Sequence, residues 1–209
     1  MKGKLICIVG GDGVGKTSVI EKVYEILTKK GLVVTKTREP GGVESAEKIR
    51  DIILNYNIDG ITEALLFAGA RRENVVNNIK PALKRGEIVL TDRYLHCSLV
   101  YQGIARGLGY ENVLEINRLA IEDCIPDLTI VLDMDTSKAI KRLSDRNDIN
   151  RLDKETLEFK EKVRNGYLSL ANKMSNIVVI NSDQKLEDVV EDVMKKITPL
   201  IWQMSNINI

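Results

Sequence analysis

The sequence predicts an α/β fold in which a doubly wound, five-stranded parallel sheet carries helices on both faces. Short apolar runs rich in β-branched residues alternate with longer helical patterns along all 209 residues. Most of these runs are unbroken rather than alternating in polarity, which is typical of strands buried on both faces of a parallel sheet. A glycine cluster joins the first run to the first helical pattern, which indicates a tight strand-to-helix connection.

The elements follow in a regular order. An apolar run predicts the first strand at 4–9, and the spacing of Val19, Ile20 and Val23 predicts a helix at 15–29. The runs "LVVTKT", "EIVLTD", "DLTIVLD" and "NIVVI" predict the later strands at 32–37, 87–92, 127–133 and 176–180. The remaining helices are predicted at 44–55, 62–84, 110–124, 136–146, 154–173 and 185–200. We expect the tail at 202–209, which follows Pro199 with little pattern, to fray or to pack by contacts outside any pattern.

Composition limits the architecture and the partners. A chain of this length supports one sizeable core, so we expect residues 1–209 to form a single domain with at most a mobile lid. Its 31 Lys and Arg nearly balance its 30 Asp and Glu, and a formal charge of +1 gives no indication of nucleic-acid or membrane binding. The three cysteines form no CxxC pair, and no apolar stretch has the length of a signal segment or a membrane span. We therefore expect a cytoplasmic protein.

The glycine cluster satisfies G-x-x-x-x-G-K-[ST], the pattern of a phosphate-binding loop (P-loop). Its glycines let backbone N–H groups converge on phosphate oxygens at a helix N-terminus. Lys16 is expected to reach the β- and γ-phosphates, and the Thr17 hydroxyl to ligate Mg²⁺. The context of strand, loop and helix favours nucleoside triphosphate binding over a glycine-rich turn without function. The predicted nucleotide-binding residues are Gly10, Gly11, Asp12, Gly13, Val14, Gly15, Lys16, Thr17 and Ser18.

The P-loop does not identify the group that receives the phosphate, because GTPases, motor ATPases and small-molecule kinases share it. The strand at 87–92 ends at Asp92, whose carboxylate is expected beside the loop, where it holds the metal directly or through water. Arg93 follows, and its planar guanidinium suits a second phosphate group. A purely structural alternative is that Asp92 and Arg93 pair with each other at the end of the strand.

Five further segments resemble the thymidylate kinase family, in particular its bacterial branch. They are "TREPGG" at 37–42, "LLFAGARRENV" at 65–75, "DRYLHCSLVYQGIARGLG" at 92–109, "PDLTIVLD" at 126–133 and "NRLDKETLEFKEKVRNGYLSLA" at 150–171. They occur in the family's order and extend from the first strand to the last helix. The resemblance implies the P-loop NTPase fold and transfer of the γ-phosphoryl group of ATP to dTMP, with Mg²⁺ held by Thr17 and Asp92.

The resemblance also implies how the base of dTMP is bound. Phe67 matches the family's aromatic residue that stacks on thymine, and Arg71 matches the arginine that hydrogen-bonds the base. Ser98 stands where the family places a small polar residue near N3 of the base, and Tyr101 where an aromatic residue packs against the sugar. Gln102 belongs to the same pocket. A flat ring requires such a stacking partner and a few directed polar groups.

The phosphate end of dTMP is expected to meet a cluster of charge. By the same resemblance Arg93, helped by Arg50 and Arg38, holds the phosphate, and Asp12 lies near the sugar 3′-hydroxyl. The acceptor is a phosphate monoester with a second pKa of about 6, so its transfer requires no general base. Catalysis is expected from positioning and from neutralisation of charge by Lys16, Mg²⁺ and Arg93.

A further arginine is expected in a mobile lid, because positions 11–14 of the P-loop contain none. The segment "KRLSDRNDINRLDKE" at 141–155 is dense in charge and interrupts two helical patterns. Arg151 matches the family's lid arginine, with Arg142 and Arg146 as nearby candidates; a solvated helix end is the structural alternative. The predicted catalytic residues are therefore Lys16, Asp92, Arg93 and Arg151.

The chain departs from the family pattern at a few positions. Val9 stands where many members have Glu, and Cys97 where Ser is frequent. Asn150 replaces a frequent Asp before the lid arginine, which is expected to loosen the anchoring of the lid. His96, the only histidine, is interpreted as a surface residue without a role.

Two other functions remain open at this stage, a kinase for another nucleotide or deoxynucleoside and a nucleotide-binding regulator without turnover. The set of Phe67, Arg71, Ser98 and Tyr101 argues against the first, and the intact catalytic residues argue against the second. The resemblance also implies a homodimer formed through the helices after the second and third strands. The apolar residues compatible with this interface are Leu65, Leu66, Val75 and Val76.

Overall fold

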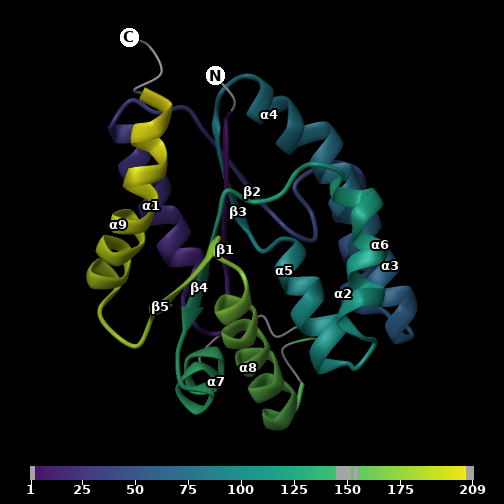
Figure 1. Cartoon of the computed structure of the whole chain (residues 1–209). Coiled ribbons are helices and arrows are strands. Elements are labelled where there is room, and N and C mark those ends of the chain that lie inside the picture. Colours follow the sequence, from purple (N-terminus) through teal and green to yellow (C-terminus); the bar gives the residue numbers. More distant parts are fainter. Residues whose placement is uncertain (1–2, 145–151, 153–154, 206–209) are drawn as a thin grey trace.

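The computed structural model describes residues 3–144, 152 and 155–205 of the chain. It contains a five-stranded parallel sheet with the strand order β2-β3-β1-β4-β5, which confirms the predicted fold class (Figure 1). The strands are β1 (Lys4–Val9), β2 (Val34–Arg38), β3 (Ile88–Asp92), β4 (Leu128–Asp133) and β5 (Ile177–Asn181). All five predicted strands are therefore present, within two residues of the expected ends.

The central position of β1 brings the predicted site residues to one edge of the sheet. Ile8 is paired with Asp92 of β3, and Val9 with Val131 of β4. The P-loop, which follows β1, therefore begins beside the end of β3. This is the carboxyl edge of the strands, where open α/β sheets bind their ligands.

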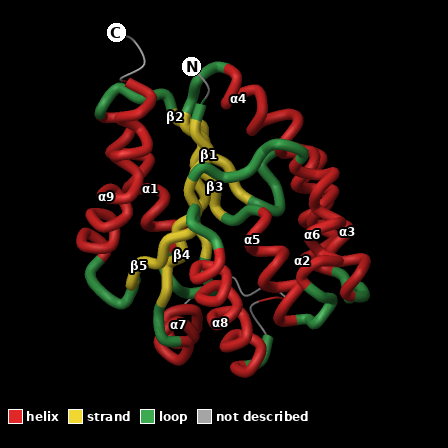
Figure 2. Tube along the Cα trace, viewed as in Figure 1, coloured by secondary structure: helices red, strands yellow, loops and turns green. Residues whose placement is uncertain are grey.

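Helices cover both faces of the sheet, as Figure 2 shows. On one face α1 (Lys16–Lys29) and α9 (Leu186–Ser205) pack on inward residues of β1 such as Ile6 and Ile8. On the other face Tyr94 and Tyr167 belong to a second cluster with the opposite side chains of the same strand. The remaining helices are α2 (Glu44–Asn55), α3 (Gly60–Asn74), α4 (Lys80–Lys84), α5 (Leu95–Ser98), α6 (Tyr110–Ile121), α7 (Thr136–Ser144) and α8 (Leu157–Lys173), with π-helical segments η1 (Val75–Ile79) and η2 (Leu99–Ala105).

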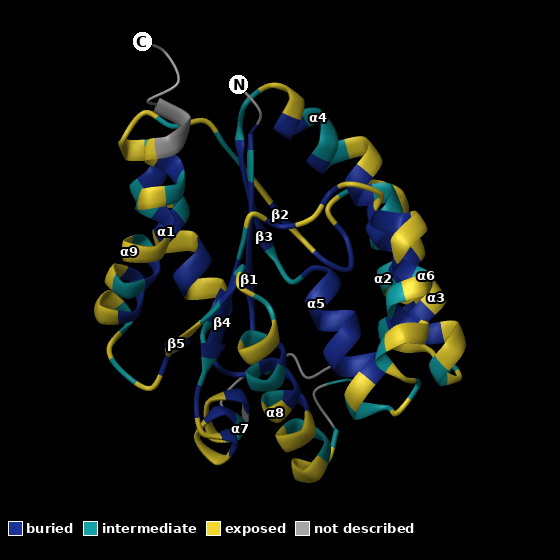
Figure 3. Ribbon diagram, in the orientation of Figure 1, coloured by how far each residue is buried: buried dark blue, intermediate teal, exposed yellow. Residues whose placement is uncertain are grey.

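The helical segment at 95–105, made of α5 and η2, has no counterpart among the predicted helices. Its first seven residues, 95–101, are all buried, and Figure 3 shows α5 as buried along its length. A helix that is buried on every side has no polar stripe, so its sequence lacks the amphipathic period of 3.6 residues. This segment carries three of the predicted substrate-binding residues into the interior.

The ends of the other helices depend on local contacts. The Asp59 carboxylate accepts hydrogen bonds from the N–H groups of Ile61 (2.9 Å) and Thr62 (3.2 Å), and so begins α3 two residues earlier than predicted. At the other end of the chain α9 continues past Pro199 because Ile197 and Ile201 remain in the core. Within the described ranges, none of the helices combines the length and apolar content that a membrane-spanning segment requires.

Candidate active site

The P-loop presents the N-terminus of α1 to the carboxyl edge of the sheet. Gly15 is the N-cap residue, with a φ of +92°, and no side chain caps the first turn. The backbone N–H groups of this turn are therefore suited to phosphate oxygens. The buried Lys16 lies across the loop, because its Nζ donates hydrogen bonds to the carbonyl oxygens of Gly10 (3.3 Å) and Gly11 (2.7 Å). Burial and then the nearby charge of Arg93 lower the pKa of Lys16.

Two glycines of the loop are required by close packing. A Cβ atom on Gly13 would lie 2.1 Å from the carbonyl oxygen of Ala139, and the φ of this residue is +88°. A Cβ atom on Gly10 would lie 2.5 Å from the carbonyl oxygen of Leu132. In contrast, apart from its own neighbours in the chain, no described residue has an atom within 4 Å of a Cβ built on Gly15. The loop is therefore fixed against β4 and α7 on one side and has room for a ligand on the other.

Arg93 is the central cation of the site. Its φ of +67° is left-handed, a conformation that costs a residue with a side chain about 1–2 kcal/mol. Its guanidinium is ion-paired with Asp12 of the P-loop and lies over the Tyr101 ring, 5.2 Å from the ring centre. The Tyr101 hydroxyl donates a hydrogen bond to the same carboxylate (3.2 Å). The partner of Arg93 is therefore Asp12, and not Asp92 as in the structural alternative.

These contacts set the charge of the loop carboxylate. Burial alone would raise the pKa of Asp12, but the charges of Arg93 and Lys16 together lower it. Asp12 therefore remains ionised between the side chains of two cations, Arg93 and Lys16.

Asp92 has the environment of a metal ligand. Its Oδ1 is buried and accepts no hydrogen bond from any described residue. Buried carboxylate oxygens in proteins are normally hydrogen-bonded or bound to a metal. Thr17 lines the same cavity, and hydroxyl and carboxylate oxygens are ligands that Mg²⁺ prefers. These two side chains therefore fit the predicted metal.

The far end of the site is organised around Arg71, which is 1% exposed. Its Nε donates a hydrogen bond to Glu39 (2.7 Å) and its Nη1 to the Ser98 hydroxyl (3.1 Å) and to the side-chain oxygen of Asn117. Glu39 and Asn117 are not among the residues predicted from the sequence. A charged residue directly after a strand, within the "TREPGG" segment, could have indicated Glu39. No sequence pattern marks Asn117, which reaches Arg71 from α6 across the fold.

One cavity of about 220 Å³ joins the two ends of the site. Its wall includes Asp12, Lys16, Thr17, Arg50, Phe67, Arg71, Asp92, Arg93, Ser98, Tyr101 and Gln102, all of them predicted site residues. Arg38 is not among the lining residues, and its exposed side chain is ion-paired with Glu47 (2.8 Å). Its role in holding phosphate stays a prediction. We refer to this space as the acceptor cavity.

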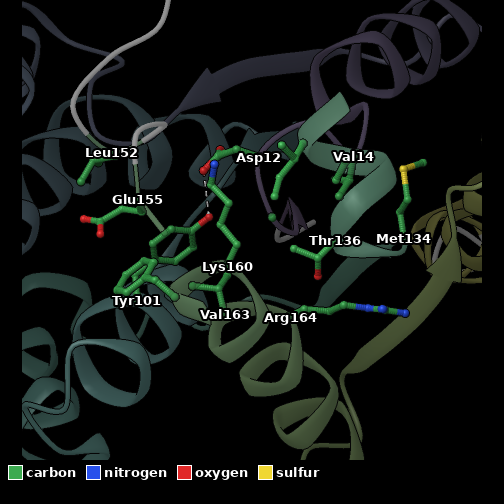
Figure 4. Close-up of a pocket in the computed structure, with 14 residues that line it drawn as sticks. Asp12, Val14, Tyr101, Met134, Thr136, Leu152, Glu155, Lys160, Val163 and Arg164 are labelled. Carbon is green, nitrogen blue, oxygen red and sulfur yellow. Dashed lines mark hydrogen bonds between the residues drawn. The ribbon is translucent and has the colours of Figure 1, made fainter. Parts of the chain in front are cut away.

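A second, smaller cavity of about 30 Å³ lies on the other side of the P-loop, between α7 and α8. Figure 4 shows Lys160 extending from α8 toward Asp12, and the charge of this lysine contributes to the lowered pKa of Asp12. Arg164 points away and holds Asp133 at the end of β4 with two hydrogen bonds of 2.8 and 2.9 Å. Asp12 and Tyr101 line both cavities, so the two spaces share a wall.

Much of the predicted lid at 141–155 lies outside the residues that the structure describes. Arg146, Asn150 and Arg151 lie outside the described residues, whereas Arg142 is exposed on α7. The lid prediction is therefore untested at its main arginine. Glu155, two residues before α8, accepts a hydrogen bond from Nη2 of Arg106 (2.8 Å).

The segment after β3 places His96 and Cys97 in the interior of the protein. The interpretation of His96 as a surface residue is wrong, because it is 1% exposed and its Nδ1 is hydrogen-bonded to the Thr129 hydroxyl (3.1 Å). Burial and the charge of Arg71 lower the pKa of His96 to about 4. The adjacent Cys97 is also buried and lies 2.8 Å from the Tyr167 hydroxyl.

Comparison with known proteins identifies the family. A sequence model described as Thymidylate kinase matches residues 8–193. The chain is 48% identical to the thymidylate kinase of Geobacillus sp. (strain WCH70), over 90% of this chain and 93% of that protein. It is 45% identical to the thymidylate kinase of Bacillus velezensis, over 94% and 96% of the two chains, and 42% identical to that of Clostridium novyi, over 92% and 97%.

Proposed function

The chain belongs to the thymidylate kinase family, and from this premise we propose how its residues transfer the γ-phosphoryl group of ATP to dTMP. As a member it is an enzyme that phosphorylates dTMP. The observation that carries the assignment of residues is the acceptor cavity, which has P-loop residues at one end and Arg71 at the other. We propose that residues 1–209 form one kinase domain that acts in the cytoplasm.

Thymidylate binds along this cavity with its base at the Arg71 end. Phe67, on α3, stacks on the ring, and Arg71 and Ser98 offer hydrogen bonds to its edge. The close approach of Tyr101 to Asp12 leaves little room beside the sugar, which suits a 2′-deoxyribose. Groups held rigidly by buried partners lose little entropy on binding, so this arrangement is pre-organised.

The phosphate of dTMP lies between Arg93 and Arg50. Arg93 offers a planar pair of donors, and Arg50 is held by the carbonyl oxygen of Pro40 (3.0 Å). We propose that Asp12 gives up part of its contact with Arg93 when the phosphate arrives. Lys16 and the N-terminus of α1 hold the ATP phosphates, so the acceptor oxygen and the γ-phosphorus lie on one line between cations.

Thr17 and Asp92 would hold Mg²⁺. The metal, when bound with ATP, neutralises charge on the phosphates during the transfer. The unpartnered Oδ1 of Asp92 is the observation in favour of this role. Lid arginines, Arg151 first, remain proposed partners of the transferring group.

We further propose a homodimer through α3 and α6. Leu65 is 54% exposed on α3 and Leu119 is 84% exposed on α6, and a groove lies between the two helices. Val76 is also exposed, but Val75 belongs to the core and is not available to a partner. Replacement of Leu119 by Glu is expected to convert a dimer into a monomer in sedimentation velocity experiments; an unchanged sedimentation coefficient would contradict this interface.

A coupled ADP-release assay tests the proposed function. ATP and Mg²⁺ are supplied with dTMP, dUMP, dCMP, dGMP or no acceptor, and the formation of dTDP is measured by chromatography. We expect ADP release to require dTMP and to match dTDP formation one to one. ADP release that is independent of the acceptor, or ATP binding without any turnover, would contradict the assignment of the acceptor cavity.

A further inference from the structure

Glu63 is a buried charge that lies behind the wall of the acceptor cavity, in contact with the lining residue Gln102, and the proposed mechanism does not use it. It lies on α3 and is 1% exposed. Its Oε1 accepts hydrogen bonds from Nε2 of Gln102 (3.0 Å) and from Nε of Arg106 (2.8 Å). Arg106 in turn donates to Glu155 (2.8 Å). A charged group so deeply buried is costly unless its partners compensate it, which points to a specific task.

The neighbouring guanidinium determines the form of Glu63. Arg106 remains charged at any physiological pH and stabilises the carboxylate form of Glu63. An ionised carboxylate only accepts hydrogen bonds. Gln102 must therefore turn its NH₂ group toward Glu63, and its carbonyl oxygen toward the opposite side. The orientation of this amide, which is usually ambiguous, is fixed here by chemistry.

The side chain of Gln102 also belongs to the wall of the acceptor cavity. Gln102 lines this cavity together with Arg71 and Ser98. The carbonyl oxygen of Gln102 accepts no hydrogen bond from a described residue. The cavity wall thus offers an acceptor where the opposite amide orientation would offer two donors.

We propose that Glu63 is a positioning residue that selects the base of the acceptor by fixing the Gln102 amide. This inference rests on the proposed function. A pyrimidine nucleotide with an N3–H group, thymine or uracil, donates to the carbonyl oxygen of Gln102. Cytosine carries a lone pair at N3 and would meet that oxygen with repulsion. Glu63 therefore favours thymidylate and uridylate over cytidylate without touching the base.

The consequence for specificity is larger than for overall affinity. A site built to hydrogen-bond an N–H group rejects the analogue that lacks it, because the polar group of the site is then left unpaired. An amide free to rotate would accommodate either base. Loss of the anchor is therefore expected to reduce the preference for dTMP over dCMP more than it reduces the turnover number.

The test compares kcat/KM for dTMP and dCMP in variants at position 63. Glu63→Leu removes the acceptor, and we expect the ratio of the two constants to fall by about tenfold or more, through KM for dTMP. Glu63→Gln keeps an acceptor oxygen and is expected to restore most of the preference. Glu73→Gln, on the same helix but at a carboxylate that is hydrogen-bonded to Ser45 instead of Gln102, serves as the matched control and is expected to leave both constants within about threefold of the parent.

A double-mutant cycle separates positioning from a general loss of structure. In a Gln102→Leu background, Glu63→Leu is expected to have no further effect on the ratio, because the amide that it positions is absent. If Glu63→Leu does not fold, Glu63→Asp, which withdraws the acceptor by one methylene group, replaces it with an expected fall of about threefold. A ratio that is unchanged in the folded variants, or equal losses in both backgrounds, would overturn the inference. Failure of the parent enzyme to phosphorylate dTMP would instead contradict the proposed function.

Discussion

The ion pair between Arg71 and Glu39 allows a quantitative test of the site in the unliganded protein. The two side chains are 1% and 2% exposed, and the other carboxylate oxygen of Glu39 has no hydrogen-bond partner among the described residues. Arg71→Met retains much of the side-chain volume but leaves the carboxylate buried without its counter-charge. Breaking a buried pair in this way costs about 3–5 kcal/mol of the free energy of unfolding.

The same substitution is expected to make stability depend on pH. Burial raises the pKa of Glu39 even with Arg71 present. Because the charge of Arg71 lowers this pKa, the removal of Arg71 raises it further. A carboxyl group whose pKa is higher in the folded than in the unfolded state stabilises the fold at low pH. This stability is lost as the pH rises above about 4.5, the ordinary value. Arg71→Met is thus expected to lower the free energy of unfolding more at pH 8 than at pH 5.5.

Urea unfolding of the unliganded protein, followed by circular dichroism at both pH values, measures these free energies. The double variant Glu39→Gln with Arg71→Met serves as the control, and it is expected to recover most of the loss and to remove its pH dependence. If Arg71→Met loses less than about 1 kcal/mol, equally at both pH values, the carboxylate does not depend on Arg71 and the reasoning is refuted.

Three further outcomes are expected. Burial lowers the pKa of His96 to about 4, so the folded protein loses stability as the pH falls from 6.5 toward 4. An NMR titration of this single histidine in the folded protein should therefore show no protonation near pH 6.5. Gly13→Ala should reduce thermal stability and ATP affinity much more than Gly31→Ala, because both glycines have positive φ but only the first would contact Ala139; similar losses would contradict the packing of the loop. Asp92→Asn should raise the Mg²⁺ concentration for half-maximal activity by about tenfold, and an unchanged Mg²⁺ dependence would exclude the proposed metal role.

The sequence predicted most of the fold because the strands and amphipathic helices carry periodic signals. The segment at 87–92, for example, contains the apolar run 88–90 and appears as β3 with nearly the same bounds. The segment at 95–105 was missed for the opposite reason. Its burial on all sides removes the polar face from which a helix is normally recognised.

Most of the residues that line the acceptor cavity could be predicted because they belong to sequence motifs. The other residues of the site are placed there by tertiary contacts that no motif encodes. Asn117 and Glu63 are hydrogen-bonded to site residues from positions that none of the recognised motifs includes. His96 was misassigned because the sequence does not show which residue from another part of the chain will contact it. In the fold, the Thr129 hydroxyl is its hydrogen-bond partner, and this contact allows the histidine to be buried. Arg151 and the remaining lid stay predictions, because they lie outside the described residues.

The order of the strands has a consequence for how acceptor choice is encoded. Because β2 and β3 lie on the same side of β1, most of the acceptor cavity comes from one uninterrupted part of the chain, 39–102. The contacts of the P-loop with Leu132 and Ala139, by contrast, involve β4 and α7 on the other side. An exchange within 39–102 that retains Asp92 and Arg93 is therefore expected to transfer the preference for one nucleotide into a relative while leaving the binding of ATP by the P-loop intact. In this architecture one continuous segment of the chain determines the choice of acceptor. The P-loop, which binds the phosphoryl donor, is instead held in place by β4 and α7.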